Sequence, residues 1–272
     1  MKTPNSRRNL DRAIIRLAGS QDGFVRTRTA IANGLVGQML PNGAVKGGSS
    51  LKIRFGDAVT RATTDLDAAR ATGLDAFIAD MADSLARGWN GFSGRMVPQS
   101  PAAPRDVSPS YAMRPFDIKL EYLGQPWCTV RFELGHDEIG DADNPEFRIP
   151  EEANRILAQL GFPGLGPVPP LMPLHHQIAQ KLHGASEPGS RRAHDLIDLQ
   201  VIMANAEVDP PLVRRTCERL FAYRKMQAWP PKIENVPGWD ELYAAQALSS
   251  VAPTVGEAIE WANGLIAAIC SA

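Results

Sequence analysis

The sequence predicts a mixed α/β (α+β) fold, in which a small mixed β-sheet is flanked by helices and followed by a helical C-terminal portion. Three observations predict this fold. Two alternating runs, 116–123 and 127–134, are joined at Gly124-Gln125-Pro126, which is typical of a β-hairpin. Apolar residues at helical spacing occur before the hairpin and after it. From residue 174 onward the pattern is helical throughout.

The N-terminal half is predicted to contain helices and two short segments that carry polar residues. Helices are expected at 8–19, at 25–40 and, with a clear apolar stripe, at 74–87. Gly-Gly-Ser at 47–49 reads as a turn, and the run Leu51–Phe55 after it fits either a strand or a helix. Residues 63–68 are brief and bounded by polar residues, so we expect a strand there.

The middle of the chain contains an expected loop and an expected domain junction. Residues 90–110 are rich in Gly, Ser and Pro and show no periodicity, which predicts a surface loop. A helix at 150–160 leads into a Gly- and Pro-rich stretch, which predicts a boundary between residues 1–165 and residues 166–272. Further helices are expected at 174–184, 192–205, 210–223, 239–248 and 254–270.

Length and composition exclude several classes of protein. With 272 residues, 44% of them hydrophobic, the chain can bury a substantial core. Its three cysteines, Cys128, Cys217 and Cys270, are far apart and odd in number, so we expect neither a disulfide framework nor a cysteine metal clip. No stretch approaches the roughly 20 apolar residues of a membrane span. The basic N-terminus lacks the apolar run of a signal peptide, and a cytoplasmic location is expected.

Charge is distributed unevenly along the chain. The net charge of −1 argues against a protein that coats nucleic acid through its overall charge. Two basic runs are nevertheless present, and they fit either solvated helix faces or phosphate-binding surfaces. The first run comprises Lys2, Arg7, Arg8, Arg12, Arg16, Arg26 and Arg28, and the second Arg214, Arg215, Arg219, Arg224, Lys225 and Lys232. An acidic loop lies between them, with Asp137, Glu138, Asp141, Asp143, Glu146, Glu151 and Glu152.

Two neighbouring segments carry candidate chemistry. In a strand, residues i and i+2 point to the same side, so Asp65 and Asp67 would project their carboxylates from one face. Two carboxylates side by side suit Mg²⁺, which keeps several waters and binds phosphate oxygens. The Gly47-Gly48-Ser49 turn lets backbone N–H groups and a hydroxyl approach a triphosphate closely. Either segment alone is common in proteins, but together they predict a site for a metal-bound NTP.

Two separated blocks of sequence resemble one known family. The first, Lys46 to Leu51 followed by Arg61 to Asp67, is similar to the Gly-Gly-Ser/Thr-x-Leu and Arg-x-Ser/Thr-x-Asp-Leu/Ile-Asp motifs of DNA-polymerase-β-like nucleotidyltransferases. The likeness is greatest to the AbiEii/AbiGii toxin family, which includes the MenT-like toxins. The second block, Ile178 to Ala185 followed by Arg192 to Leu199, resembles that family's Ala-Glu-Lys-Leu and Arg-Asp-x-x-Asp-Leu motifs. The resemblance covers roughly residues 40–205.

The resemblance implies a function and a set of site residues. It implies a nucleotidyltransferase core at 1–165 and a helical portion at 166–272 that completes the active-site cleft. The expected activity is transfer of a nucleotide from a Mg²⁺-bound NTP to an acceptor, RNA at the 3′ end of tRNA, by the toxin of a toxin–antitoxin pair. Gly48, Ser49 and Lys181 are expected to bind the nucleotide, Asp65 and Asp67 to bind the metal, and Asp195 to join the catalytic set.

Departures from the family pattern leave part of the site open. Gln180 stands where the family has Glu, and His194 where it has Arg. A third metal carboxylate is expected, and Glu133 is preferred over Glu121, although either fits a strand acid paired across the hairpin. Lys181 also fits a surface lysine that extends past apolar neighbours, and Asp195 an acid that stabilises a helix N-terminus.

Other functions remain as alternatives or are disfavoured. A small-molecule nucleotidyltransferase of the antibiotic-modifying kind would use the same motifs, and so would a non-catalytic nucleotide-binding protein. His175, His176, His183 and His194 lie near one another in sequence, but no HExxH motif or cysteine partner accompanies them, which disfavours a zinc site. No phosphate-binding P-loop, GxSxG elbow or Rossmann fingerprint is present.

Overall fold

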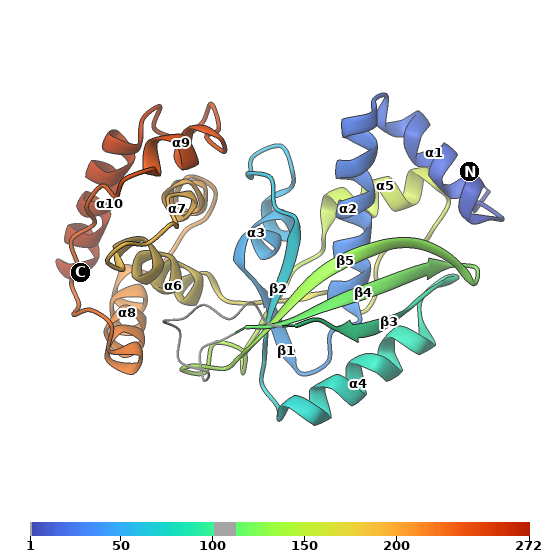
Figure 1. Ribbon diagram of the computed structural model, residues 1–272, viewed down its shortest axis with the longest axis horizontal. Helices are drawn as coiled ribbons and strands as arrows, with labels where there is room; N and C mark the ends of the chain where they lie inside the picture. The colour runs from blue at the N-terminus through green and yellow to red at the C-terminus, as the bar shows by residue number, and fades with distance from the viewer. Residues whose placement is uncertain (1, 101–112) are drawn as a thin grey trace. The chain divides into compact units, whose positions relative to one another are not determined.

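A computed structural model describes residues 2–100 and 113–272 (Figure 1). The chain divides into two compact units. Unit 1 comprises Met1–Asp57 and Thr63–Met172, and unit 2 comprises Ala58–Ala62 and Pro173–Ala272. The five residues 58–62 therefore belong with the C-terminal helices, although they lie between two segments of unit 1.

Unit 1 is built on a seven-stranded mixed sheet with the strand order β3-β4-β5-β2-β1-β7-β6. The pairs β2/β5 and β1/β7 are parallel, and the other neighbours are antiparallel. The expected hairpin is confirmed as β4 and β5. The strands are β1 (Gly43–Lys46), β2 (Asp65–Arg70), β3 (Phe92–Pro98), β4 (Arg114–Tyr122), β5 (Gln125–His136), β6 (Glu146–Phe147) and β7 (Pro170–Leu171).

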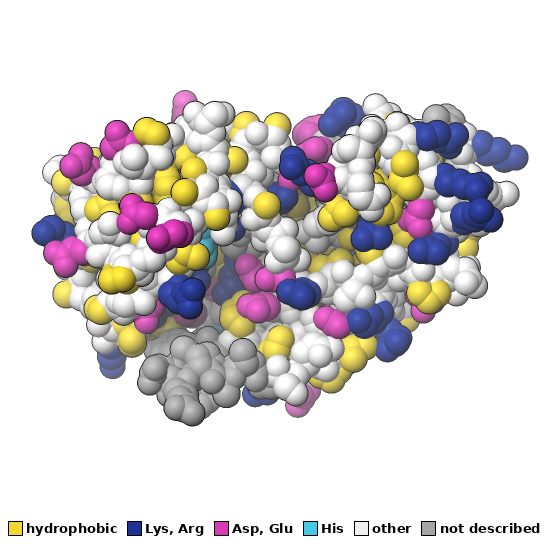
Figure 2. All heavy atoms as spheres, turned by 45° about the horizontal axis from the view of Figure 1, so that its top comes forward, with side chains coloured by type: hydrophobic (Ala, Val, Ile, Leu, Met, Phe, Trp, Pro, Cys, Tyr) yellow, Lys and Arg dark blue, Asp and Glu magenta, His cyan; other side chains and the backbone are white. Residues whose placement is uncertain are grey.

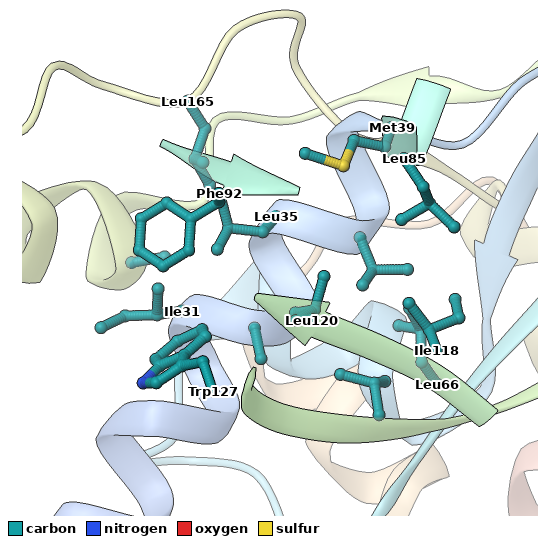
Figure 3. Close-up of a cluster of buried hydrophobic side chains, with 14 of the residues drawn as sticks. Ile31, Leu35, Met39, Leu66, Leu85, Phe92, Ile118, Leu120, Trp127 and Leu165 are labelled. Carbon is teal, nitrogen blue, oxygen red and sulfur yellow. The ribbon is translucent and has the colours of Figure 1, made fainter. Parts of the chain in front are cut away.

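The helices of unit 1 cover one face of this sheet. They are α1 (Arg7–Ala18), α2 (Gln21–Gln38), α3 (Gly47–Phe55), α4 (Leu74–Arg87) and α5 (Glu151–Gln159). Ser6 and Ser20 cap α1 and α2 by accepting hydrogen bonds from backbone N–H groups three residues on. In the core, Ile31, Leu35 and Met39 pack against strand residues that include Leu66, Phe92, Ile118, Leu120 and Trp127 (Figure 3).

The pleat of the strands sends polar residues to the other face. On β4, Phe116, Ile118, Leu120 and Tyr122 are buried, whereas the residues between them are partly exposed. On β2, Leu66 is fully buried between Asp65 and Asp67. The two predicted metal ligands therefore lie on the face opposite the hydrophobic core.

Two local predictions are corrected by the structure. The predicted loop at 90–110 begins instead with strand β3, because residues 92–98 pair along their whole length with β4. That pairing stabilises a strand in a segment with weak propensity of its own. Residues 101–110 of the predicted loop lie outside the described residues. Gly47-Gly48-Ser49 is not a free turn but the first turn of α3, which also settles Leu51–Phe55 as helix.

Unit 2 is helical, as expected. Its helices are α6 (Leu174–Ser186), α7 (His194–Asn205), α8 (Pro210–Arg224), α9 (Trp239–Ala244) and α10 (Val255–Cys270). Asp209 caps α8, and Thr254 and Glu257 form a capping box on α10. Within residues 2–100 and 113–272, no helix is both long enough and apolar enough to cross a membrane.

Candidate active site

The N-terminus of α3 lies beside the aspartates of β2. The backbone N–H groups of a first helical turn have no partner within the helix, and here the preceding residue, Lys46, provides no side-chain cap. Gly47 has φ +65°, and a Cβ at this position would collide with Oδ2 of Asp67. Only glycine allows the α3 N-terminus to approach this carboxylate so closely, and such an N-terminus favours anions.

The hydroxyl of Ser49 ties α3 to β2. Ser49 is fully buried, and its Oγ donates a hydrogen bond to the backbone carbonyl of Asp65. This bond fixes the first turn of α3 against the start of the strand that carries Asp65 and Asp67. The structure therefore gives Ser49 a structural contact, and its predicted contact with phosphate remains a prediction.

Three carboxylates lie together on adjacent strands. In the parallel pair β2/β5, Asp67 is the register partner of Glu133 and Asp65 that of Arg131. Residues in register on one sheet face are near neighbours. The pKa of Glu133 is raised by burial and by the negative charges of Asp67 and Asp65, whereas the positive charge of Lys46 lowers it. The three carboxylates therefore repel one another, which a bound cation would relieve.

The carboxylate oxygens of Asp65 and Asp67 fit a divalent cation that also binds the phosphate oxygens of a substrate. Oδ1 of Asp65 is buried and has no hydrogen-bond partner in the described part of the chain, so it is an acceptor available to a cation. Over those same residues, no group of three or more His, Cys, Asp or Glu side chains is arranged to hold a metal ion. A pair of aspartates suits Mg²⁺, because waters and phosphate oxygens complete its coordination.

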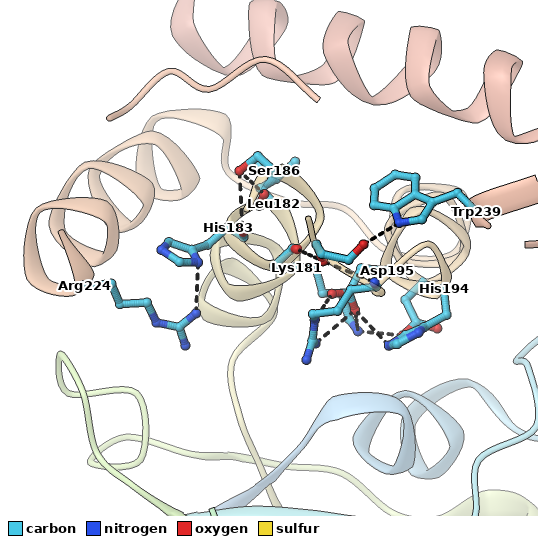
Figure 4. A network of polar contacts seen from close by, with 12 residues as sticks. Lys181, Leu182, His183, Ser186, His194, Asp195, Arg224 and Trp239 are labelled. Atoms are coloured by element: carbon cyan, nitrogen blue, oxygen red, sulfur yellow. Dashed lines mark hydrogen bonds and ion pairs between the residues drawn. The ribbon is translucent and has the colours of Figure 1, made fainter. Parts of the chain in front are cut away.

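In unit 2, Lys181 lies in a buried ionic network (Figure 4). Lys181 is 3% exposed, and its Nζ lies 2.6 Å from Oδ2 of Asp198 and 3.2 Å from Oδ1 of Asp195. Arg192 Nε contacts Asp195 Oδ2 at 2.6 Å, and Arg61 forms two parallel bonds to Asp198 at 2.8 and 3.0 Å. Three cations thus surround two carboxylates, which leaves this network with excess positive charge.

The electrostatics of the network keep both carboxylates ionised. Burial by itself would raise the pKa of Asp195, but Arg192 and Lys181 hold that pKa well below its usual range. The pKa of Asp198 is lowered in the same way by Lys181 and Arg61. His194 Nε2 lies 3.8 Å from Asp195 Oδ1, and burial lowers the pKa of His194 to about 4. The histidine is therefore neutral near pH 7 and adds no charge.

Comparison with protein families identifies the chain. The model of the family described as "Nucleotidyl transferase AbiEii toxin, Type IV TA system" matches residues 37–262. The chain belongs to the AbiEii toxin family. It is therefore a nucleotidyltransferase toxin, and its family implies a nucleotide substrate and an antitoxin partner. The matched range contains both the aspartate pair of unit 1 and the ionic network of unit 2.

A solved structure with a TM-score above 0.5 shows the same fold. MenT4, the nucleotidyltransferase toxin Rv2826c from Mycobacterium tuberculosis H37Rv, is similar with a TM-score of 0.60 and 19% identity, covering 94% of this chain and 89% of that one. JHP933 from Helicobacter pylori is similar with a TM-score of 0.45 and 12% identity, covering 92% of each chain. Among curated proteins, no match is found.

The two candidates for the third carboxylate of this AbiEii-family site lie far apart. Glu133 is opposite Pro115 on β4, whereas Glu121 is opposite Pro126, near the hairpin turn. Seven residues of β5 separate these two positions, roughly 20 Å at the rise of a strand. Glu121 is therefore remote from Asp67, and Glu133 is adjacent to it.

Lys46 is a functional candidate that the sequence analysis did not single out. It is the register partner of Asp67 on β1, and its charge lowers the pKa of Glu133 and of the buried Asp141. In the sequence, the only feature that points to a functional role for Lys46 is its position directly before Gly47-Gly48. Because the strand order places β1 next to β2, this ammonium group lies among the carboxylates.

The predicted site residues thus form two groups. Gly48, Ser49, Asp65, Asp67 and Glu133 come together in unit 1, and Lys181 and Asp195 come together in unit 2. The first group is assembled from segments distant in sequence, whereas the second comes from the consecutive helices α6 and α7. The prediction that both groups contact one nucleotide remains a prediction.

Proposed function

We propose that this toxin transfers a nucleotide from a Mg²⁺-bound NTP to RNA, with the 3′ end of tRNA as the acceptor. The observation that carries the proposal is the Asp65–Asp67 pair: Oδ1 of Asp65 is buried without a partner among the described residues, and the carboxylate of Asp67 lies against Gly47 at the N-terminus of α3, which has no side-chain cap. Carboxylate oxygens that can bind a cation therefore lie next to backbone N–H groups that can bind an anion. A metal-bound triphosphate presents both charges.

Each group in unit 1 has a distinct role in the proposal. Asp65 and Asp67 would hold the cation, with Glu133 as the expected third ligand, and the bound cation would polarise the reacting phosphate. The N–H groups at Gly48 and Ser49 bind phosphate oxygens. The 3′ hydroxyl of the acceptor attacks the α-phosphorus, pyrophosphate leaves, and Glu133 accepts the hydroxyl proton.

The network in unit 2 supplies positive charge for the triphosphate. Lys181 has three donors, and two of them are used by Asp195 and Asp198. In the proposal, the third donor binds a phosphate oxygen of the NTP. Asp195, held by Lys181 and Arg192, orients the ammonium group.

The biological setting follows from the substrates and the family. NTPs and RNA are present in the cytoplasm, where we expect the toxin to act. A separately encoded antitoxin protein is its proposed partner.

The test is incubation of the protein with each labelled NTP, Mg²⁺ and total cellular RNA. We expect one NTP to label RNA of tRNA size, and omission of Mg²⁺ to abolish labelling. Labelling of a small molecule and not of RNA would contradict the RNA acceptor and indicate an antibiotic-type transferase. Mg²⁺-dependent NTP binding without any turnover would contradict catalysis and indicate a nucleotide-binding protein.

A further inference from the structure

The two N-terminal helices carry a concentrated positive charge. Between residues 2 and 28 the chain has seven basic and two acidic residues, whereas the whole chain has a net charge of −1. In Figure 2, dark blue side chains gather at the end of unit 1 where α1 lies. This patch is defined by Lys2, Arg8, Arg12, Arg16 and Arg26, all of which are exposed.

Helical spacing aligns most of this charge. Arg8, Arg12 and Arg16 are four residues apart on α1, so they lie along one side of the helix. Two open hollows adjoin on this side, of about 390 and 430 Å³, and both are lined by Asn9 and Arg16. Arg12 and Arg16 therefore line concave surface beside Asn9, and Lys2 lines the second hollow.

Four arginine side chains of the patch have no polar partner among the described residues. Arg7 pairs with Asp11 at 3.1 Å, and Arg28 lies 4.8 Å above the ring of Phe24. In contrast, the side chains of Arg8, Arg12, Arg16 and Arg26 make no hydrogen bond or ion pair with any residue of 2–100 and 113–272. Guanidinium groups of this kind are free to bind phosphates.

The second basic run is more heavily engaged. Arg214 contacts Glu218 at 3.0 Å and the carbonyl of Cys270 at 2.9 Å, so it joins α8 to the end of α10. Arg224 contacts Nδ1 of His183 at 3.3 Å. Part of the charge on α8 therefore stabilises unit 2, which makes α8 the weaker candidate for binding a polyanion.

The patch is held rigidly on unit 1. Leu10 and Ile14 are fully buried, and Asp11 accepts a hydrogen bond of 3.0 Å from Nε1 of Trp127 on β5. From Trp127, β5 runs to Glu133, six residues or roughly 20 Å further on. A ligand that contacts both the patch and the carboxylates must therefore span several nucleotides, which excludes a small molecule.

We propose that the α1–α2 patch binds the phosphodiester backbone of the RNA acceptor. The inference rests on the proposed function, because it concerns the acceptor of that same reaction. It goes further in that it selects α1 and α2, and not α8, as the docking surface. Phosphate contacts of this kind position RNA without reading its sequence.

The test measures binding of fluorescein-labelled bulk tRNA across a salt series without NTP, so that docking is separated from transfer. The variant is Arg12→Gln/Arg16→Gln, and the matched control is Arg215→Gln/Lys225→Gln, which removes two exposed charges from the α8 region. We expect the α1 variant to bind at least about 10-fold more weakly in low salt and to lose about 1.4–1.8 from its log–log salt slope. The control should keep the wild-type affinity and slope.

Several results would overturn the proposal. One is equal affinity and slope for the α1 variant and wild type, given unchanged melting temperatures; another is loss of binding in the α8 control alone. Binding of vesicles containing anionic phosphatidylserine that depends on Arg12 and Arg16, without any effect on tRNA, would assign the patch to a lipid surface, since Ile15 and Leu17 are also exposed.

Failure of the proposed function gives a different pattern. In that case, tRNA binding would still depend on Arg12 and Arg16, but no NTP would label RNA. If both proposals hold, the α1 variant should instead retain Mg²⁺-dependent labelling of a short oligoribonucleotide that does not reach the patch. An Asp65→Ala variant should bind tRNA with the wild-type slope.

Discussion

Gly47 at the start of α3 lies directly against the carboxylate of Asp67 on β2. Its φ of +65° and the absence of a side chain both matter, because a Cβ would occupy the space of Oδ2. The register of β1 and β2 creates this contact by pairing Lys46 with Asp67. One glycine therefore sets the separation between the helix N-terminus and the metal-binding aspartates of the proposed site.

Gly47→Ala should reduce transfer by about 100-fold or more, because displacement of reacting groups by about 1 Å costs that much. The left-handed backbone adds about 1–2 kcal/mol of destabilisation. Gly124→Ala is the matched control, since Gly124 has φ +72° with nothing within 4 Å of its Cβ position. It should lose similar stability but keep activity. Equal activities for the two variants in an NTP-labelling assay would refute the role of Gly47.

Asp65→Ala and Asp67→Ala should each abolish transfer without destabilising the fold. Both side chains are partly exposed, and Asp65 Oδ1 has no hydrogen-bond partner among the described residues to lose. Removal of either charge also relieves repulsion with Glu133. Urea unfolding should therefore give a free energy within about 0.5 kcal/mol of wild type, or above it. Full activity in both variants would show that the metal assignment is wrong.

Glu133→Gln and Glu121→Gln form a matched pair on one sheet face. Because only Glu133 neighbours Asp67, its replacement should lower kcat by about 100-fold and raise the Mg²⁺ concentration needed for half-maximal rate. Glu121→Gln should behave as wild type in the same Mg²⁺ titration. The reverse outcome would transfer the role of third carboxylate to Glu121.

Asp141 should make the protein less stable as pH rises toward neutrality. Burial and a hydrogen bond with Asp137 raise the pKa of Asp141 to about 7. Between about pH 4 and pH 7 the folded state therefore keeps a proton that the unfolded state releases, so the free energy of unfolding falls with rising pH. The slope is at most about 1.4 kcal/mol per pH unit.

Asp141→Asn removes this titration and should flatten the dependence. The variant should resemble wild type near pH 4 and be more stable near pH 8, measured by urea unfolding at several pH values. Asp143→Asn, at an exposed position of the same loop, should follow the wild-type curve. An unchanged pH dependence in Asp141→Asn would contradict the raised pKa.

The fold was predictable where periodicity is strong. The hairpin alternates buried and exposed residues along β4 and β5, and the helices of unit 2 show continuous apolar spacing, so both could be recognised locally. Strand β3 could not, because its sequence contains Gly94 and Pro98 and its stability comes from pairing with β4. The assignment of residues 58–62 to unit 2 also depends on a distant contact, that of Arg61 with Asp198.

Local sequence motifs were enough to predict the family and the enzyme class. Residue types and their spacing are local properties, so the two motif blocks sufficed to indicate the AbiEii family and a nucleotidyltransferase. Which side chains are neighbours in space depends on the folding of the whole chain. The parallel pairing of β2 with β5 places Glu133 next to Asp67, and the pairing of β1 with β2 brings Lys46 there. Strand order and ion pairing join residues far apart in the chain, and no local pattern encodes them.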